Sequence, residues 1–206
     1  MGEGERAVTA FVIGLTGPMG AGKSMVGGML RELGAKVLDA DAMVRDEQLR
    51  GTVGYTAIVQ TFGTKVLGED KEIDRARLAE EVFGDPAKLQ RLERILHPRV
   101  IARVLQARSM LPDDAVLVVE AIKLLEGDLR QACDRIWVVL APREMLIDRL
   151  AGRGMRPGEA ELRLASQLSE ERFRAAADTV IVNDGDREQA RARVQDAWSR
   201  VRAARA

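Results

Sequence analysis

The residues with the clearest chemical signature are Gly17-Pro18-Met19-Gly20-Ala21-Gly22-Lys23-Ser24, which match the pattern G-x-x-x-x-G-K-[ST] in full. Glycine has no Cβ and tolerates positive φ, so such a loop lets backbone N–H groups approach a phosphate closely. The lysine ammonium reaches the β- and γ-phosphate oxygens, and the serine hydroxyl is a ligand of Mg²⁺. The sequence therefore predicts a site for a nucleoside triphosphate and Mg²⁺, formed by Gly17, Gly20, Ala21, Gly22, Lys23, Ser24 and Met25.

The segments on both sides of this loop have the periodicity that such a site requires. Residues 11–15 are an apolar run that predicts a short buried strand, and residues 25–33 carry apolar side chains at helical spacing. A loop between a strand and a helix directs its N–H groups and the positive end of the helix dipole toward the phosphates. A plain glycine-rich turn is the structural alternative. The dinucleotide-binding fingerprint does not fit, because no G-x-G-x-x-G spacing occurs.

Three carboxylates follow predicted strands. Asp39 and Asp41 come at the end of residues 36–39, and Glu120 follows the apolar run 115–119. In an open α/β sheet the carboxyl ends of the strands face the ligand crevice. Asp41 is therefore a candidate to accept a proton from an attacking hydroxyl, and Glu120 is a candidate to orient Mg²⁺. The structural alternative for Asp41 is a cap on the next helix, and one aspartate can cap while the other acts.

Two further apolar runs, residues 134–140 and 178–183, complete a set of five predicted strands that alternate with helices. This alternation is typical of parallel sheets, because parallel neighbours need helical crossovers. The predicted fold class is α/β: a doubly wound five-stranded parallel sheet of the P-loop NTPase type, with a helical insertion and an arginine-rich helical lid. The core is assigned to residues 1–46 and 112–206, the insertion to residues 47–111 and the lid to residues 143–176.

The insertion contains the only histidine of the chain. His97 is followed by Pro98 and lies between two apolar helical turns. A lone histidine in such a place is more often a hydrogen-bonded structural residue than a catalyst. From its position alone, both interpretations stay open.

Arginines are frequent in the lid segment, which the pattern predicts to be a pair of helices. Arg149 and Arg153 are four residues apart and are therefore expected on one helix face. Phosphoryl transfer needs cations around the equatorial oxygens, and a mobile lid with glycines near its bends can bring them there while it excludes water. We expect Arg149 to face the triphosphate. For most of the other arginines, a solvated surface balanced by acidic residues is the better interpretation.

Composition argues against several other classes of protein. The 206 residues include 32 Lys and Arg and 32 Asp and Glu, so no net charge attracts nucleic acid or an anionic membrane. Aromatic residues make up only 3%, which argues against a platform for single strands. The single cysteine, Cys133, indicates a reducing cytoplasm and is expected to be a small, buried or half-buried residue. No apolar segment approaches the length that a membrane-spanning helix needs. The sequence leaves the oligomeric state unknown.

The motifs, taken in order, resemble the dephospho-coenzyme A kinase family over nearly the whole chain. The resemblance is carried by residues 13–17 running into the phosphate-binding loop, by Asp39-Ala40-Asp41, by Ile73-Asp74-Arg75, by residues 92–98 ending in His97-Pro98, and by residues 177–183 with Gly185. It implies the transfer of a phosphoryl group from ATP, with Mg²⁺, to the 3′-hydroxyl of the ribose of dephospho-CoA, a small-molecule substrate. This reaction is the last step of CoA synthesis.

The resemblance also implies roles for individual residues. Asp41 matches the position of the general base, and Arg149 matches the arginine of the lid. Arg75 and His97 fall in the part of the chain that forms the CoA-binding subdomain in similar proteins, and Thr16 and Asp41 join them as expected substrate contacts. Asn183 matches a position near the adenine of the nucleotide.

Three places depart from the family pattern. Met25 stands where similar proteins usually have threonine, and Leu146 stands where they commonly have glutamine. The segment Ile122-Lys123-Leu124-Leu125-Glu126 stands where the family tends to have Pro-Leu-Leu-Phe-Glu, so this loop is expected to alter how the acceptor binds.

Three rival interpretations remain. One is another small-molecule kinase with a nucleoside or shikimate-like acceptor. The second is a GTPase-like switch, whose guanine-binding Asn-Lys-x-Asp is absent from the sequence. The third is an ATPase stimulated by nucleic acid, which the balanced charge disfavours.

Overall fold

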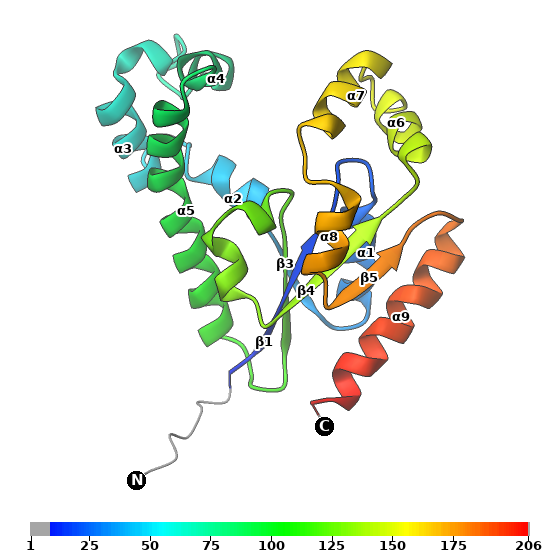
Figure 1. Ribbon diagram of the computed structural model, residues 1–206. Helices are drawn as coiled ribbons and strands as arrows, with labels where there is room; N and C mark the ends of the chain where they lie inside the picture. The colour runs from blue at the N-terminus through cyan, green and yellow to red at the C-terminus, as the bar shows by residue number, and fades with distance from the viewer. Residues whose placement is uncertain (1–8, 206) are drawn as a thin grey trace. The chain divides into compact units, whose positions relative to one another are not determined.

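A computed structural model describes residues 9–205 of the chain (Figure 1). The described residues divide into two compact units, one made of residues up to 38 together with those from 107 onward, and one made of residues 39–106. The second unit starts and ends earlier than the insertion expected from the sequence, residues 47–111. It starts earlier because the helix that follows Asp39 makes its polar contacts within this unit.

The first unit is built on a parallel sheet. In the described chain its strands are β1 (Phe11–Thr16), β2 (Lys36–Asp39), β3 (Val116–Glu120), β4 (Arg135–Leu140) and β5 (Thr179–Val182). They follow the order β2-β3-β1-β4-β5, and the pairs β1–β3, β1–β4 and β4–β5 are parallel. The predicted five-stranded doubly wound sheet is therefore confirmed.

Both faces of the central strands are buried, which explains why their sequences are almost continuously apolar. In β4, Trp137 and Val139 belong to the core that also contains Met29 of the first helix. The alternate residues Ile136 and Val138 point to the opposite face and are equally buried. The carboxyl ends of these strands are thereby held rigidly, and the loops that follow them start from fixed positions.

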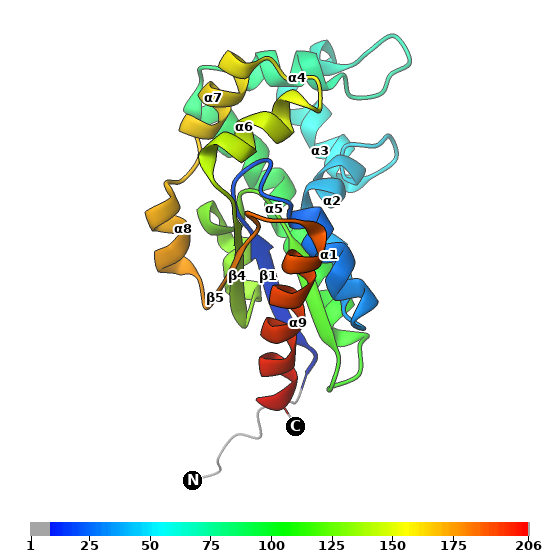
Figure 2. The same ribbon diagram turned by 90° about the vertical axis from the view of Figure 1, so that its right-hand side faces the viewer.

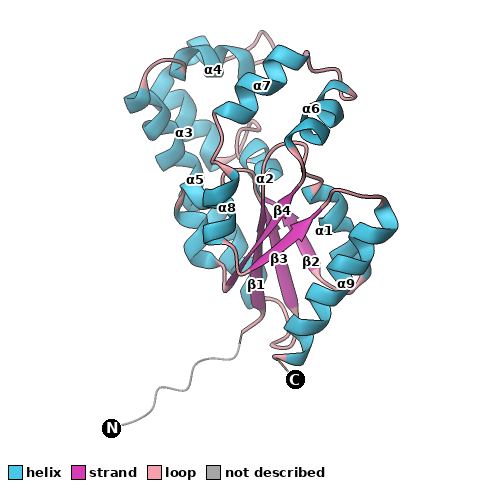
Figure 3. Cartoon of the chain, turned by 45° about the vertical axis from the view of Figure 1, so that its right-hand side comes forward, coloured by secondary structure: helices cyan, strands magenta, loops and turns pink. Residues whose placement is uncertain are grey.

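The helices of the first unit cover both faces of the sheet (Figure 3). They are α1 (Lys23–Glu32), α6 (Arg143–Ala151), α7 (Pro157–Ala165), α8 (Glu170–Ala176) and α9 (Arg187–Ala203). Helices α1 and α9 lie side by side on one face, and α8 lies on the other (Figure 2). Helices α6 and α7 stand beyond the carboxyl ends of the strands (Figure 1).

The segment predicted as a lid differs from the expected pair of helices. Residues 143–176 form three helices in the described chain, α6, α7 and α8. The prediction that Arg149 and Arg153 share a helix face is wrong, because α6 ends at Ala151 and the chain turns through Gly154 at a φ of 87°. Of these two arginines, only Arg149 lies on α6.

The second unit is helical in the residues described. It contains α2 (Ala40–Asp46), α3 (Val53–Phe62), α4 (Arg75–Val82) and most of α5 (Pro86–Ser109), with a short 3₁₀ turn at Thr64–Val66. A small core joins these elements and is formed by Ile58, Phe62, Val66, Leu78 and Leu96. Helix α5 begins at Pro86, because proline suits the first position of a helix, and the Asp85 carboxylate accepts hydrogen bonds from the N–H groups of Ala87 and Lys88.

Cys133 is a half-buried residue, as its solitary position in the sequence predicted. Burial, with a smaller contribution from the neighbouring Asp134 carboxylate, raises the pKa of its thiol to about 12. The thiol is therefore protonated near neutral pH and is a poor nucleophile. Among residues 9–205, none of the helices is both long enough and apolar enough to cross a membrane.

Candidate active site

The phosphate-binding pattern forms the turn between β1 and α1. Helix α1 starts at Lys23, and Gly22 before it has a φ of 98° and supplies no side-chain cap. The first N–H groups of this helix are therefore suited to an anion. A Cβ on Gly17 would lie 2.1 Å from the carbonyl oxygen of Val139, so the loop can pass over β4 only with glycine at that position.

Lys23 lies along the loop with its side chain directed inward. The residue is only 7% exposed, and its Nζ donates hydrogen bonds to the carbonyl oxygens of Gly17 at 2.9 Å and Pro18 at 3.0 Å. Its positive charge thus lies inside the turn that a triphosphate is expected to fill.

Two side chains that are distant in sequence donate hydrogen bonds to the loop. One belongs to α6, and the other belongs to the residue that follows β5. Nδ2 of Asn183 donates to the carbonyl oxygen of Ala21 at 2.8 Å, and Asn183 is 3% exposed. The Arg149 guanidinium donates to the carbonyl oxygens of Asn183 at 3.0 Å and Gly20 at 3.4 Å. The amide group of Asn183 is thus engaged by the loop, and its expected position near the adenine stays a prediction. Arg149 lies at the loop, and its role toward a triphosphate stays a prediction.

Ser24 and Glu120 come together at the other side of the loop. The Ser24 hydroxyl donates to Oε1 of Glu120 at 2.7 Å, and the register of β1 with β3 sets Glu120 opposite Leu15. A hydroxyl and a carboxylate are hard oxygen donors of the kind that Mg²⁺ prefers, and Mg²⁺ usually keeps few protein ligands beside phosphates and waters. The described residues contain no cluster of three or more His, Cys, Asp or Glu side chains that could hold a metal ion. The pair fits a magnesium site that a bound triphosphate completes.

Two other residues assigned to ligands from the sequence face the interior. Thr16 is fully buried, and its hydroxyl donates to the carbonyl oxygen of Ile122 at 3.2 Å. This hydrogen bond fixes the loop after β3, and the assignment of Thr16 to substrate binding stays a prediction. The Met25 side chain packs against the hydrophobic core, so a contact with nucleotide would have to use its backbone N–H.

The two aspartates after β2 have different surroundings. Asp39 has extended backbone angles, and its carboxylate accepts a hydrogen bond from the N–H of Ala42 at 2.8 Å. Asp39 is therefore the cap of α2, and the proposed capping role of Asp41 is wrong because Asp41 already lies in the first turn. Asp41 is half-buried, and its role as proton acceptor stays a prediction.

Arg75 and His97 are both part of the second unit. Arg75 is exposed at the first position of α4, and His97 is half-buried on α5. The two helices share one core, in which Leu78 of α4 packs with Leu96 of α5. Within the described residues neither side chain has a hydrogen bond or ion pair, so the hydrogen-bonded structural role considered for His97 has no support.

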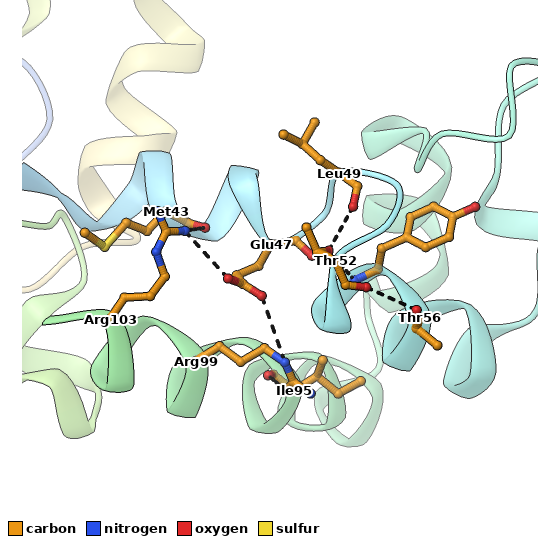
Figure 4. A network of polar contacts seen from close by, with 9 residues as sticks. Met43, Glu47, Leu49, Thr52, Thr56, Ile95, Arg99 and Arg103 are labelled. Carbon is orange, nitrogen blue, oxygen red and sulfur yellow. Dashed lines mark hydrogen bonds and ion pairs between the residues drawn. The ribbon is translucent and has the colours of Figure 1, made fainter. Parts of the chain in front are cut away.

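A network of charges fixes α2 on α5 inside the second unit (Figure 4). Arg103 lies 3.0 Å from the carboxylate of Asp46 and 3.6 Å from that of Glu47, and it donates to the carbonyl oxygen of Met43. Arg99 approaches the other oxygen of Glu47 at 4.0 Å. The helix with Asp41 and the helix with His97 are thus linked by ion pairs and a hydrogen bond that no sequence motif indicated.

Gln167 also lies at the loop, although no sequence motif contains it. Its side-chain oxygen accepts a hydrogen bond from the N–H of Met19, inside the phosphate-binding loop, at 3.0 Å. Gln167 lies in the connection between α7 and α8, and nothing in its local sequence distinguishes it from a solvated glutamine. Its importance becomes visible only when the two distant segments are brought together.

A parallel sheet of order β2-β3-β1-β4-β5, with G-x-x-x-x-G-K-S between β1 and α1 and a Ser–Glu pair beside it, defines a P-loop kinase. The family model described as "Dephospho-CoA kinase" matches residues 11–189. The chain belongs to the dephospho-CoA kinase family.

Individual relatives agree with this assignment. The chain is 42% identical to a dephospho-CoA kinase of Streptomyces avermitilis over 188 residues, which cover 91% of this chain and 92% of the relative. A crystal structure of TT1252 from Thermus thermophilus has a TM-score of 0.82 and 30% identity, with 93% of this chain and 97% of that one covered. A dephospho-CoA kinase structure from Campylobacter jejuni has a TM-score of 0.60 at 24% identity, covers 92% and 96% of the two chains, and supports the fold.

Proposed function

We propose that this protein transfers the γ-phosphoryl group of ATP to the 3′-hydroxyl of the ribose of dephospho-CoA, which yields CoA and ADP. The observation that carries the proposal is the extent of the family match, which runs over residues 11–189 and so includes the second unit as well as the phosphate-binding loop. A nucleotide site alone would not identify the acceptor, because P-loops serve many reactions.

The reaction divides into a nucleophilic and an electrophilic part. The ribose O3′ forms a bond to the γ-phosphorus as the bond to the bridging oxygen of ADP breaks, and its proton passes to the Asp41 carboxylate. Lys23 and Arg149 stabilise the negative charge on the phosphoryl oxygens. Ser24 and Glu120 would hold Mg²⁺, which neutralises charge on the β- and γ-phosphates when it is bound. Helices α6 to α8 act as the lid that excludes water in this scheme.

The magnesium assignment predicts a specific defect for Glu120→Gln. The carboxylate loses its charge but keeps its shape, so the Mg²⁺ concentration for half-maximal activity should rise by roughly 10- to 100-fold, as is usual when a supporting ligand is lost. Titration of activity with Mg²⁺ at saturating ATP measures this shift. Glu188→Gln, an exposed carboxylate on α9, is the control and should leave the titration unchanged. An unchanged midpoint for Glu120→Gln would remove this residue from the metal site.

The acceptor assignment predicts separate effects for the second unit. Arg75 and His97 are unpaired among the described residues, and the diphosphate and adenine of dephospho-CoA suit a guanidinium and an imidazole. Arg75→Ala and His97→Ala should each raise KM for dephospho-CoA, or lower kcat/KM, by about tenfold or more, which corresponds to roughly 1.4 kcal/mol. KM for ATP should stay nearly constant in steady-state assays with each substrate varied.

Arg91→Ala is the matched control for these variants, because Arg91 is an exposed arginine on α5 outside the family motifs. It should behave as wild type. If both Arg75→Ala and His97→Ala also do so, or if the intact protein phosphorylates adenosine as well as dephospho-CoA, the second unit is not the acceptor site.

One assay separates the proposal from its rivals. ATP, Mg²⁺ and a panel of alcohols that includes dephospho-CoA, nucleosides and shikimate are supplied, and the phosphorylated product is identified. A kinase does not turn over ATP until its acceptor is added, whereas a switch or a motor hydrolyses GTP or ATP without an acceptor. We place the reaction in the cytoplasm and assign a small-molecule acceptor, supported by the single cysteine, which cannot form an internal disulfide, and by the balanced charge.

A further inference from the structure

Gln167 links the phosphate-binding loop to the three-helix segment α6–α8. It lies between α7 and α8, and its Oε1 accepts the N–H of Met19 at 3.0 Å across 148 residues of sequence. Beside this hydrogen bond is a pocket of about 330 Å³, whose lining includes Pro18, Leu146 and Phe173 as well as Gln167. The contact is partly buried, so the N–H would lose a fixed partner if Gln167 were replaced by an apolar residue.

Gln167 differs from the other side chains that hold the loop. Lys23, Arg149 and Asn183 donate hydrogen bonds to loop carbonyl oxygens, whereas Gln167 accepts one from a loop N–H. Arg149 reaches the carbonyl oxygen of Gly20, the residue next to Met19. Met19 and Gly20, which are adjacent in the loop, therefore form hydrogen bonds with side chains of two segments, the α7–α8 connection and α6. Because α6 and α7 pack on each other, the two attachments form one support.

We propose that Gln167 is a positioning residue for phosphoryl transfer: through the Met19 N–H it fixes the loop relative to α6–α8, so that Lys23 and Arg149 face the same phosphate. The inference rests on the proposed kinase function. Its physical reason is that a charge stabilises a transition state only when it is held in place, and small displacements of positioned groups are costly.

The variant that tests this is Gln167→Met, which keeps the length of the side chain and removes the acceptor. It should lower kcat about tenfold and raise the dissociation constant of ATP severalfold in calorimetry, while KM for dephospho-CoA stays within about twofold. Amide hydrogen exchange of Met19, followed by NMR, should accelerate about tenfold or more. The thermal midpoint should stay within about 2 °C of wild type.

Gln167→Glu is the conservative variant, because it keeps an acceptor oxygen. It should retain protection of the Met19 amide and return kcat at saturating ATP to within about threefold of wild type. Its added negative charge is expected to raise KM for ATP, so kcat is the quantity to compare. Ser166→Ala, which loses only a local hydrogen bond to the Arg163 carbonyl oxygen, is the control and should match wild type in every measurement.

The outcomes separate this inference from the proposed function. If wild type fails to phosphorylate dephospho-CoA, the function is wrong, and the ATP affinities of Gln167→Met and Ser166→Ala alone decide the role of Gln167. If wild type is active and Gln167→Met has normal kcat and ATP affinity, Gln167 is not a positioning residue and the inference is wrong. A joint fall of kcat and thermal midpoint without recovery in Gln167→Glu would show a purely structural role and would overturn the inference.

Discussion

Lys23→Ala should lower the rate of phosphoryl transfer on the order of 10³-fold or more, which corresponds to about 4 kcal/mol of transition-state stabilisation. The ammonium group lies inside the turn, where it is shielded from water and close to the positions expected for the β- and γ-phosphates. In such a place a positive charge is worth far more than on the surface. Steady-state kinetics with ATP and dephospho-CoA measures the loss.

In the structure, Lys23 also has a second function, because its ammonium group supports the loop. The same ammonium holds the carbonyl oxygens of Gly17 and Pro18, so its removal also loosens the loop. Lys23→Met keeps the length and apolar stem of the side chain and should lose activity to a similar extent, with unchanged circular dichroism. A folded Lys23→Ala variant within threefold of wild-type activity would contradict the assignment of the loop as a phosphate site.

Asp41→Asn should lower kcat by roughly 10²- to 10⁴-fold and leave ATP binding nearly unchanged. The amide cannot accept the ribose proton, yet it fits the same space in the first turn of α2. The experiment combines kcat at saturating substrates with an ATP dissociation constant from calorimetry. Loss of ATP affinity, or of folding, would show that Asp41 positions metal or structure instead of moving a proton.

Asp39→Asn is the matched control, and the structure explains why it is a clean one. Asp39 caps α2 through the N–H of Ala42, and asparagine is as good a cap as aspartate. The exposed ion pair with Arg45, at 3.6 Å, is worth little. The control should therefore have nearly wild-type stability and activity, and a strong kinetic defect in it would reassign the proton acceptor.

The strands and the phosphate-binding loop could be predicted closely because their signals are local. Residues 11–15 were expected and Phe11–Thr16 observed for β1, and β2 was expected at residues 36–39 and observed at Lys36–Asp39. A buried parallel strand must be apolar on both faces, and a loop that passes close to another backbone needs glycine. Such requirements restrict residues that are consecutive in the chain, so they can be recognised in the sequence.

The features that the sequence did not reveal are those that tertiary structure decides. Asp39 is at once the last residue of β2 and the cap of α2, so the helix starts earlier than the apolar pattern suggests. The hydrogen bond from Asn183 to the carbonyl oxygen of Ala21, 162 residues away, could not be predicted from either segment. Thr16 faces Ile122 because β1 and β3 are neighbours, and no spacing within either segment reveals this.

The long sequence separations of the contacts that hold the phosphate-binding loop have a consequence for how the protein folds. The partners of the loop lie 129, 148 and 162 residues away, at Arg149, Gln167 and Asn183. Contacts of such high sequence separation form late, because the entropy of closing a long chain segment is lost before they stabilise anything. A nascent chain that has emerged only as far as α8 lacks Asn183 and β5. The nucleotide-binding motif thus reaches its final geometry only after the chain has been synthesised as far as β5 and Asn183.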